Sequence, residues 1–145
     1  MGYRSDVVML LYGKEEVFPI LKLWVEENLI PVIKEYGVDN TDGGRTMLFD
    51  NGDNTYGQDG LWLFTRGVYK GYVYKECGTK WYPDYPEIQA FEAVRDKFAE
   101  VFNRDNHAAE LAMEFMRIGE EPNDIESIDS FHSVGLLSVQ RDIVY

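Results

Sequence analysis

Val7-Val8-Met9-Leu10-Leu11-Tyr12, a continuous apolar run closed by Gly13, is the stretch that decides the predicted fold. An extended chain with this sequence would present apolar side chains on both faces, which is typical of a strand buried in the middle of a sheet. Residues 14–29 then carry apolar side chains at spacings of three and four, with charged residues between them, which predicts a helix with one buried stripe. We expect Pro31 to end or kink this helix and Gly37 to stop it.

The middle of the chain is rich in turn formers and in short strand candidates. Strands are predicted at Arg45–Phe49, Leu61–Thr65 and Val68–Glu76, because aromatic and β-branched residues dominate these stretches. The last two are expected to pair as an antiparallel meander. The Asn-Gly pair at 51–52 indicates a hairpin after the first of them.

The second half of the chain repeats the alternation of helix and strand. A helix is predicted from Pro86 to about residue 102, because Ile88, Phe91, Val94 and Phe98 recur at helical spacing. A strand over Leu111–Ile118 follows, then an acidic loop over Glu120–Ser130, and then a last strand over Val134–Tyr145 in which Gly135 marks a bulge.

This order, β-α-β-β-β-α-β-β, predicts a single α+β domain spanning residues 1–145. Two helices with one apolar stripe each are best buried on one face of a mainly antiparallel sheet. The two halves of the chain favour the split, ferredoxin-like arrangement of strands. A chain of this length can bury a core without a disulfide or a structural metal.

The charge of the chain limits its partners. Lys and Arg number 14 and Asp and Glu number 26, which gives a net charge of −12. Such a protein repels phosphate backbones and anionic lipid, so we expect no direct binding of nucleic acid and no membrane association. A basic protein would be attracted instead, although the charge could equally serve only to solvate the surface. Cys77 is the one cysteine, and with no long apolar segment we expect a cytoplasmic protein.

No motif for catalysis, for a metal or for a cofactor stands out. His107 and His132 lack the His-x-Ser/Thr context of two-histidine phosphoesterases, and Cys77 has no assignable base. The loop that begins at Asp50 is rich in oxygen ligands but fails the calcium pattern, because Thr55 stands where glycine is required. We therefore expect no cofactor and no metal, and the sequence leans against an enzyme.

Two surface features remain as candidates for binding a partner. One is the acidic stretch, and the other is a group of aromatic residues that precedes the second helix; side chains of these types are common at protein interfaces. The alternatives are a merely solvated loop and a set of core aromatics. The predicted partner-binding residues are Glu120, Glu121, Asp124, Glu126, Asp129, Trp81, Tyr82 and Tyr85.

Several segments resemble small proteins of tailed phages and prophages. They are Lys80-Trp81-Tyr82-Pro83-Asp84-Tyr85-Pro86-Glu87-Ile88-Gln89-Ala90-Phe91-Glu92, Met113-Glu114-Phe115-Met116-Arg117-Ile118-Gly119-Glu120, Asp124-Ile125-Glu126 and the opening Gly2-Tyr3-Arg4-Ser5-Asp6-Val7. The resemblance implies a viral origin and the cytoplasm of an infected bacterial host. It implies no reaction, and no catalytic residue is transferred by it.

These observations lead to three hypotheses of function. The first is an accessory phage protein that binds and modulates a basic host protein through its acidic and aromatic surface, in an anti-defence or DNA-mimic role. The second is a binder of a small nucleotide that uses the aromatics together with Arg4, Arg45, Arg66 or Arg117. The third is a structural subunit of a homo-oligomer with an exposed sheet edge.

Overall fold

The computed structural model describes residues 2–37, 47–49, 59–103, 109–139 and 143–144. Its strands are β1 (Ser5–Lys14), β2 (Met47–Phe49), β3 (Gly60–Arg66), β4 (Tyr69–Thr79), β5 (Ala112–Gly119), β6 (Ile125–Asp129), β7 (Ser138–Val139) and β8 (Ile143–Val144). Its helices are a 3₁₀ turn (Glu15–Val17), α1 (Phe18–Asn28), α2 (Ile30–Tyr36) and α3 (Pro86–Val101). The predicted α+β class is confirmed.

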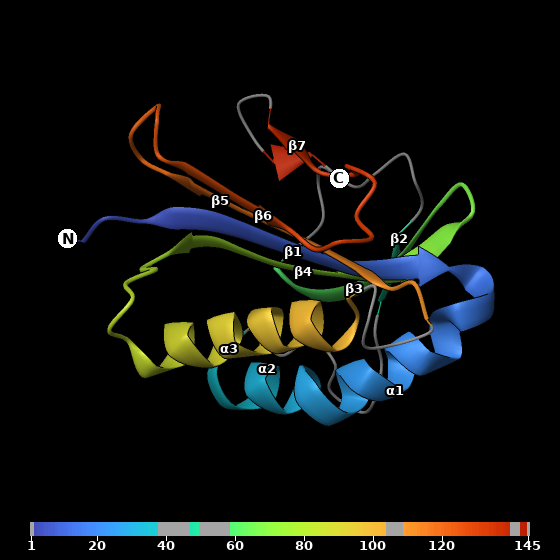
Figure 1. Cartoon of the computed structure of the whole chain (residues 1–145). Coiled ribbons are helices and arrows are strands. Elements are labelled where there is room, and N and C mark those ends of the chain that lie inside the picture. The colour runs from blue at the N-terminus through green and yellow to red at the C-terminus, as the bar shows by residue number, and fades with distance from the viewer. Residues whose placement is uncertain (1, 38–46, 50–58, 104–108, 140–142, 145) are drawn as a thin grey trace.

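Six of the strands form one sheet in the order β2-β3-β4-β1-β5-β6 (Figure 1). The apolar run of β1 lies in the middle, as predicted, and pairs antiparallel with β4 on one side and with β5 on the other. β3 and β4 form the predicted antiparallel pair. The ferredoxin-like order is not confirmed, because that arrangement places parallel strands side by side at the centre, whereas both neighbours of β1 run antiparallel to it.

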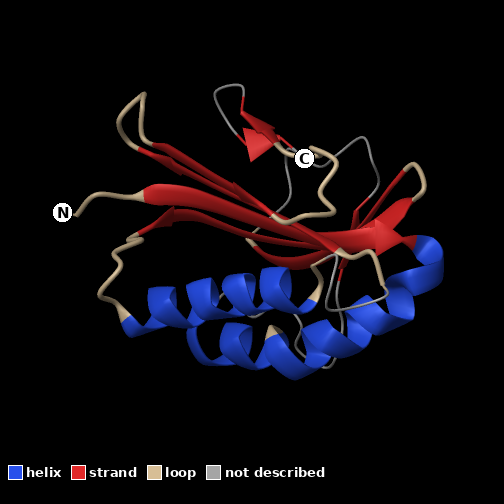
Figure 2. Ribbon diagram, in the orientation of Figure 1, coloured by secondary structure: helices blue, strands red, loops and turns tan. Residues whose placement is uncertain are grey.

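The helices cover one face of this sheet and bury its main core (Figure 2). Val7, Met9 and Leu11 point from β1 toward this face, and α1 and α3 contribute residues such as Leu21 and Phe98. The predicted first helix is interrupted at Leu29, two residues before Pro31, and α2 ends at Tyr36 with Gly37 as its C-cap. Proline therefore breaks this helix where the sequence indicates.

The opposite face of the sheet is also apolar. Val8, Leu10 and Tyr12 point from β1 toward this face, and Leu136 and Leu137 of the C-terminal segment pack against it. The predicted continuous strand over 134–145 is wrong: residues 133–137 are irregular, and β7 and β8 form a small sheet of their own. Gly135 has a φ of 76°, which lies outside the range of a regular strand.

Two further predictions, a hairpin and an acidic loop, differ from the structure because of how the strands pair. β2 runs parallel to β3, so these two strands form no hairpin, and the Asn51-Gly52 pair lies outside the described residues. The predicted acidic loop contains a strand, because β6 pairs antiparallel with β5 and forms an edge of the sheet. In the part of the chain that the structure describes, no helix is both long and apolar enough to cross a membrane.

Candidate functional site

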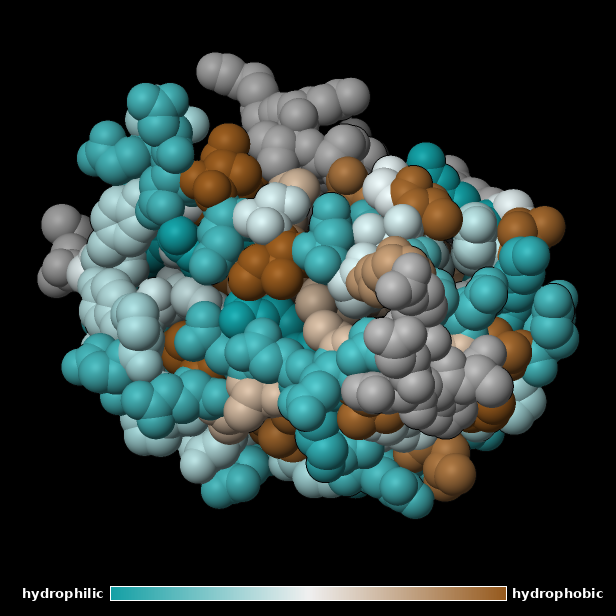
Figure 3. Space-filling view, in the orientation of Figure 1, coloured by the Kyte–Doolittle hydropathy of each residue, from teal (hydrophilic) through white to brown (hydrophobic). Residues whose placement is uncertain are grey.

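Four of the five acidic residues predicted from the sequence lie in or next to the turn between β5 and β6, and the fifth, Asp129, lies at the other end of β6, opposite Glu114. We call this surface the acidic end and define it by Glu120, Glu121, Asp124, Glu126 and Asp129. In Figure 1 the turn lies on the same side of the molecule as the N-terminus, and Figure 3 shows mainly hydrophilic residues over it. The turn is closed by the amide of Gly119, which donates to the carbonyl of Asp124 at 2.8 Å.

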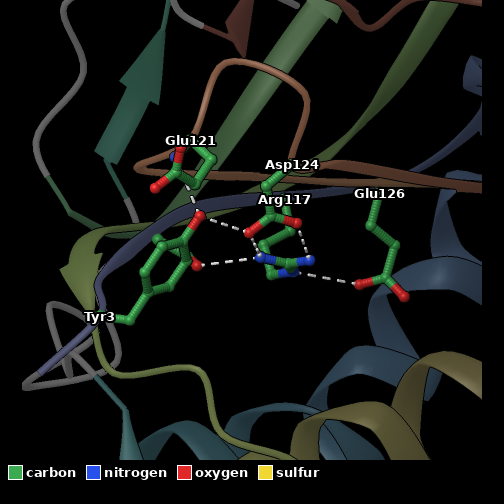
Figure 4. Close-up of polar contacts among 6 residues, drawn as sticks. Tyr3, Arg117, Glu121, Asp124 and Glu126 are labelled. Atoms are coloured by element: carbon green, nitrogen blue, oxygen red, sulfur yellow. Dashed lines mark hydrogen bonds and ion pairs between the residues drawn. The ribbon is translucent and has the colours of Figure 1, made fainter.

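Arg117 organises the carboxylates of this surface (Figure 4). Its guanidinium makes a bidentate contact with Asp124, with nitrogen–oxygen distances of 2.8 and 3.1 Å. Its Nε donates to Glu126 at 3.3 Å, across the β5–β6 pair. A fourth contact reaches the hydroxyl of Ser5 on β1 at 3.1 Å. The planar guanidinium thus joins three strands or turns at one point, which a lysine could not do in this geometry.

The N-terminal residues also hold the turn in place, through hydrogen bonds. The Tyr3 hydroxyl donates to Asp124 at 2.7 Å and accepts from the amide of Glu121 at 3.0 Å. The backbone amide of Tyr3 donates to the Tyr82 hydroxyl at 2.7 Å, and the amide of Arg4 donates to Glu120 at 3.0 Å. The acidic end is therefore a braced surface and not a loose loop.

The same contacts set the protonation states. The hydrogen bonds from Arg117 and then from Tyr3 lower the pKa of Asp124 to about 2, while the bond to Asp124 raises the pKa of Arg117. Partial burial, followed by the nearby Glu114 carboxylate, raises the pKa of Asp129. One guanidinium contacts two of the five carboxylates, so the acidic end keeps an excess of negative charge, with Glu120, Glu121 and Asp129 exposed.

The predicted aromatic residues divide between core and surface. Trp81 is buried, with its ring centroid 5.9 Å from that of Phe115 and 6.3 Å from that of Phe91, so it belongs to the core beneath α3 and is not available to a partner. Tyr82 and Tyr85 are half-buried and meet edge to face at 5.0 Å. Tyr82 is joined to the acidic end through Tyr3. The expectation of one continuous acidic and aromatic surface is thus wrong for Trp81.

A second feature, a buried carboxylate, lies on β5. Glu114 is 1% exposed and accepts hydrogen bonds from the Tyr12 hydroxyl and from the amides of Gly135, Leu136 and Leu137. Three successive backbone amides around one carboxylate form an anion-binding concavity. This contact holds the C-terminal segment against the sheet. Sequence reasoning missed it, although a lone glutamate inside the apolar run LAMEFM is a signal for a buried, fully hydrogen-bonded charge.

A pocket lies at the other end of β1, far along the strand from the acidic end. Its volume is about 410 Å³, and it is lined by Lys14, Glu16, Val17, Tyr69, Glu110, His132 and Val134. The charged residues Lys14, Glu16 and Glu110 are exposed. His132 lines the pocket, while His107 lies outside the described residues. No arginine is among the described residues that line this pocket, so this part of its lining does not match the nucleotide site predicted from arginine and aromatic residues.

Among the described residues, no group of three or more His, Cys, Asp or Glu side chains is placed to hold a metal ion. Comparisons with protein-family models, with curated proteins and with solved structures each found no match to this chain. The resemblance to phage proteins stays a prediction.

Proposed function

We propose that this protein binds a basic partner protein through the acidic end and modulates that partner. The observation that supports this proposal is the bracing of the carboxylates: Arg117 and Tyr3 hold Asp124, and the strand pairing of β6 holds Glu126 and Asp129. Charged groups fixed before binding lose little conformational entropy on association, so they raise both affinity and specificity for a complementary surface.

The chemistry of the partner follows from the charge. The whole chain carries −12, and the acidic end adds a local excess to it, so a protein with a cluster of Lys or Arg is steered toward this surface. If the phage resemblance holds, this partner is a host protein, and an enzyme that binds nucleic acid would offer such a basic groove. In that case the protein would act against host defence or as a mimic of DNA.

The two alternative functions receive less support from the contacts. For a nucleotide site, Arg117 is engaged by Asp124, Arg4 donates to the carbonyl of Gly78 at 2.8 Å, and Arg66 donates to the carbonyl of Leu136 at 3.1 Å. Arg45 lies outside the described residues. For a homo-oligomer, contact between two acidic ends would bring like charges together, which is unfavourable.

The test compares two variants with equal changes of charge. The first replaces exposed acids of the acidic end (Glu120→Gln, Glu121→Gln, Asp129→Asn) and leaves the Arg117 contacts in place. The control replaces exposed acids elsewhere (Glu15→Gln, Glu16→Gln, Glu27→Gln). Each is used as bait in lysate of a bacterial host, and the captured protein is then purified and titrated against both variants.

The expected result is a captured basic protein whose affinity is lost with the first variant and kept with the control. Its binding should also weaken as salt is raised, because screening acts on exposed charges. Equal binding by both variants would contradict the proposal, since the contact would then lie elsewhere on the molecule.

A further inference from the structure

We infer that the outer edge of β6 receives an extended, basic segment of the partner as an added antiparallel strand. This inference rests on the proposed function, because it names the mode of binding at the same surface. It starts from the position of β6, which is the last strand of the six-stranded sheet and pairs only with β5 among the described strands.

The register shows which backbone groups of β6 point outward. Gly119 donates to the carbonyl of Asp124 at 2.8 Å, and Ser130 donates to the carbonyl of Met113 at 2.9 Å. In an antiparallel pair, residues that hydrogen-bond to the neighbouring strand alternate with residues that do not. The residues of β6 that lie an even number of positions from Asp124 and Ser130 therefore hydrogen-bond to β5. The intervening residues, Ser127 and Asp129, therefore direct their N–H and C=O groups away from β5.

The outward groups lie on an accessible part of the strand. Ser127 and Asp129 are exposed, and the side chain of Ile125 has 46% of its surface exposed. The amide of Ile125 donates back into the turn, to the carbonyl of Asn123 at 3.1 Å, so pairing with a new strand would start at its carbonyl. Sheet edges with free N–H and C=O groups are the template for strand addition.

Charge determines which strand can add. Proteins commonly protect an edge with charged side chains, lysine above all, or with proline. β6 (Ile-Glu-Ser-Ile-Asp) contains neither lysine nor proline, and its two charges are both acidic, so they disfavour an acidic strand and favour a basic one. A second copy of this chain would bring five more carboxylates against the five of the acidic end. A strand with Lys or Arg opposite Glu126 and Asp129 gains cross-strand ion pairs instead, and apolar residues opposite Ile125 and Ile128 would extend the two faces of the sheet.

A peptide probe tests this geometry directly. In antiparallel pairing, Lys-Val-Thr-Lys-Val places lysines opposite Asp129 and Glu126; one further lysine at each end gives a peptide with four positive charges. The control peptide, Lys-Pro repeated four times, has the same charge but cannot form a strand ladder, because proline lacks the amide donor. The full-length protein is labelled with ¹⁵N, and amide hydrogen exchange is followed by NMR with each peptide.

The strand-forming peptide should slow exchange of the Ser127 and Asp129 amides by about tenfold or more, because these amides become hydrogen-bonded. It should also bind about tenfold more tightly than the proline peptide. Equal affinity for the two peptides, with no protection at Ser127 and Asp129, would overturn the inference. Dimerisation of the protein through β6, seen as protection of these amides without peptide, would overturn it as well.

A pair of variants separates this inference from the proposed function. Ser127→Pro removes an outward N–H and keeps the charge and the β5–β6 bonds, since proline is tolerated on an edge strand at such a position. Ser127→Thr keeps the N–H and serves as the control, and an unchanged circular dichroism melt verifies the fold of both. Loss of binding of the strand-forming peptide in Ser127→Pro alone supports strand addition. Unchanged binding of that peptide by Ser127→Pro, with loss on neutralising the carboxylates, would overturn strand addition and leave the acidic end in place as a binding surface.

Discussion

At the scale of single residues, Arg117 determines the character of the acidic end. Without it, the carboxylates of Asp124 and Glu126, two residues apart in the chain, would repel each other. With it, Asp124 receives two bonds from the guanidinium and one from Tyr3, and Glu126 receives one from the guanidinium. One cation thereby fixes the direction in which these two carboxylates point.

The protonation of Asp124 predicts how the free energy of unfolding depends on pH. Its pKa in the folded protein is about 2, below the ordinary value of 3.8, so the ionised form stabilises the fold. This stabilisation is complete above the unfolded pKa, and it is lost as pH falls through the folded pKa. The free energy of unfolding should therefore differ between wild type and Asp124→Asn by a constant amount above about pH 5, and the difference should shrink between about pH 4 and pH 2.

Urea denaturation across this pH range measures the effect, and NMR titration of the Asp124 carboxyl gives the pKa itself. Asp84→Asn, at an exposed position before α3, is the control. A difference that stays constant down to pH 2 would contradict the role assigned to the Arg117 contact. The effect is expected to be modest, because Asp124 is partly exposed and its ion pair is screened by water.

At the scale of elements, Glu114 connects β5 to the C-terminal segment. Its carboxylate bonds to the amides of Gly135, Leu136 and Leu137, at 2.8 to 3.0 Å, and Tyr12 donates to it while accepting from the amide of Val134 at 2.8 Å. This polar contact allows an irregular segment to cover the second apolar face of the sheet, because its backbone groups are hydrogen-bonded there. The position of the pocket residues His132 and Val134 depends on the same contact.

Replacing Glu114 should release this segment. Glu114→Leu leaves three backbone amides without an acceptor, and each costs about 1–3 kcal/mol if it stays buried. We expect the free energy of unfolding to fall by about 2–4 kcal/mol, because the segment can detach and let water satisfy part of the loss. Urea denaturation measures the fall, and amide exchange at residues 134–137 should accelerate more than exchange within β1.

The control for this prediction is Glu110→Leu, which makes the same substitution at an exposed site nearby. It should change stability by about 0.5 kcal/mol or less. If both variants behaved alike, the buried carboxylate would not be what anchors the segment.

At the scale of the whole molecule, the excess of acid is a source of self-repulsion. A net charge of −12 on a chain of 145 residues favours expansion at low ionic strength. We expect the melting temperature to rise by about 2–4 °C when NaCl is raised from about 20 to about 300 mM, because screening relieves the repulsion. Differential scanning calorimetry at neutral pH measures this change.

The Arg117 ion pairs should respond to salt in the opposite direction, since screening weakens attraction as well as repulsion. Arg117→Met removes these pairs, so the variant should have a lower melting temperature than wild type at low salt. Its melting temperature should also rise more than that of wild type as salt is added. A melting temperature that falls with salt in wild type would show that the ion pairs outweigh the net repulsion.

Local patterns predict the elements well wherever a single periodicity dominates. The apolar run at Val7–Tyr12 and the helical spacing from Ile88 to Phe98 correspond to β1 and α3. The candidate site was predicted less completely. Its acids were identified, but Arg117 was assigned to phosphate binding and Trp81 to the surface, and both assignments required knowing what lies across the sheet.

The sequence by itself determined the α+β class, the central strand, the break of the first helix near Pro31 and the excess of negative charge. These depend on side-chain polarity and backbone stereochemistry within a few residues. Only the tertiary structure decided the strand order, the parallel pairing of β2, the edge position of β6 and the burial of Glu114 and Trp81. The strand order, the parallel pairing and the edge position depend on contacts between residues far apart in the chain, for which a single sequence carries no local signal.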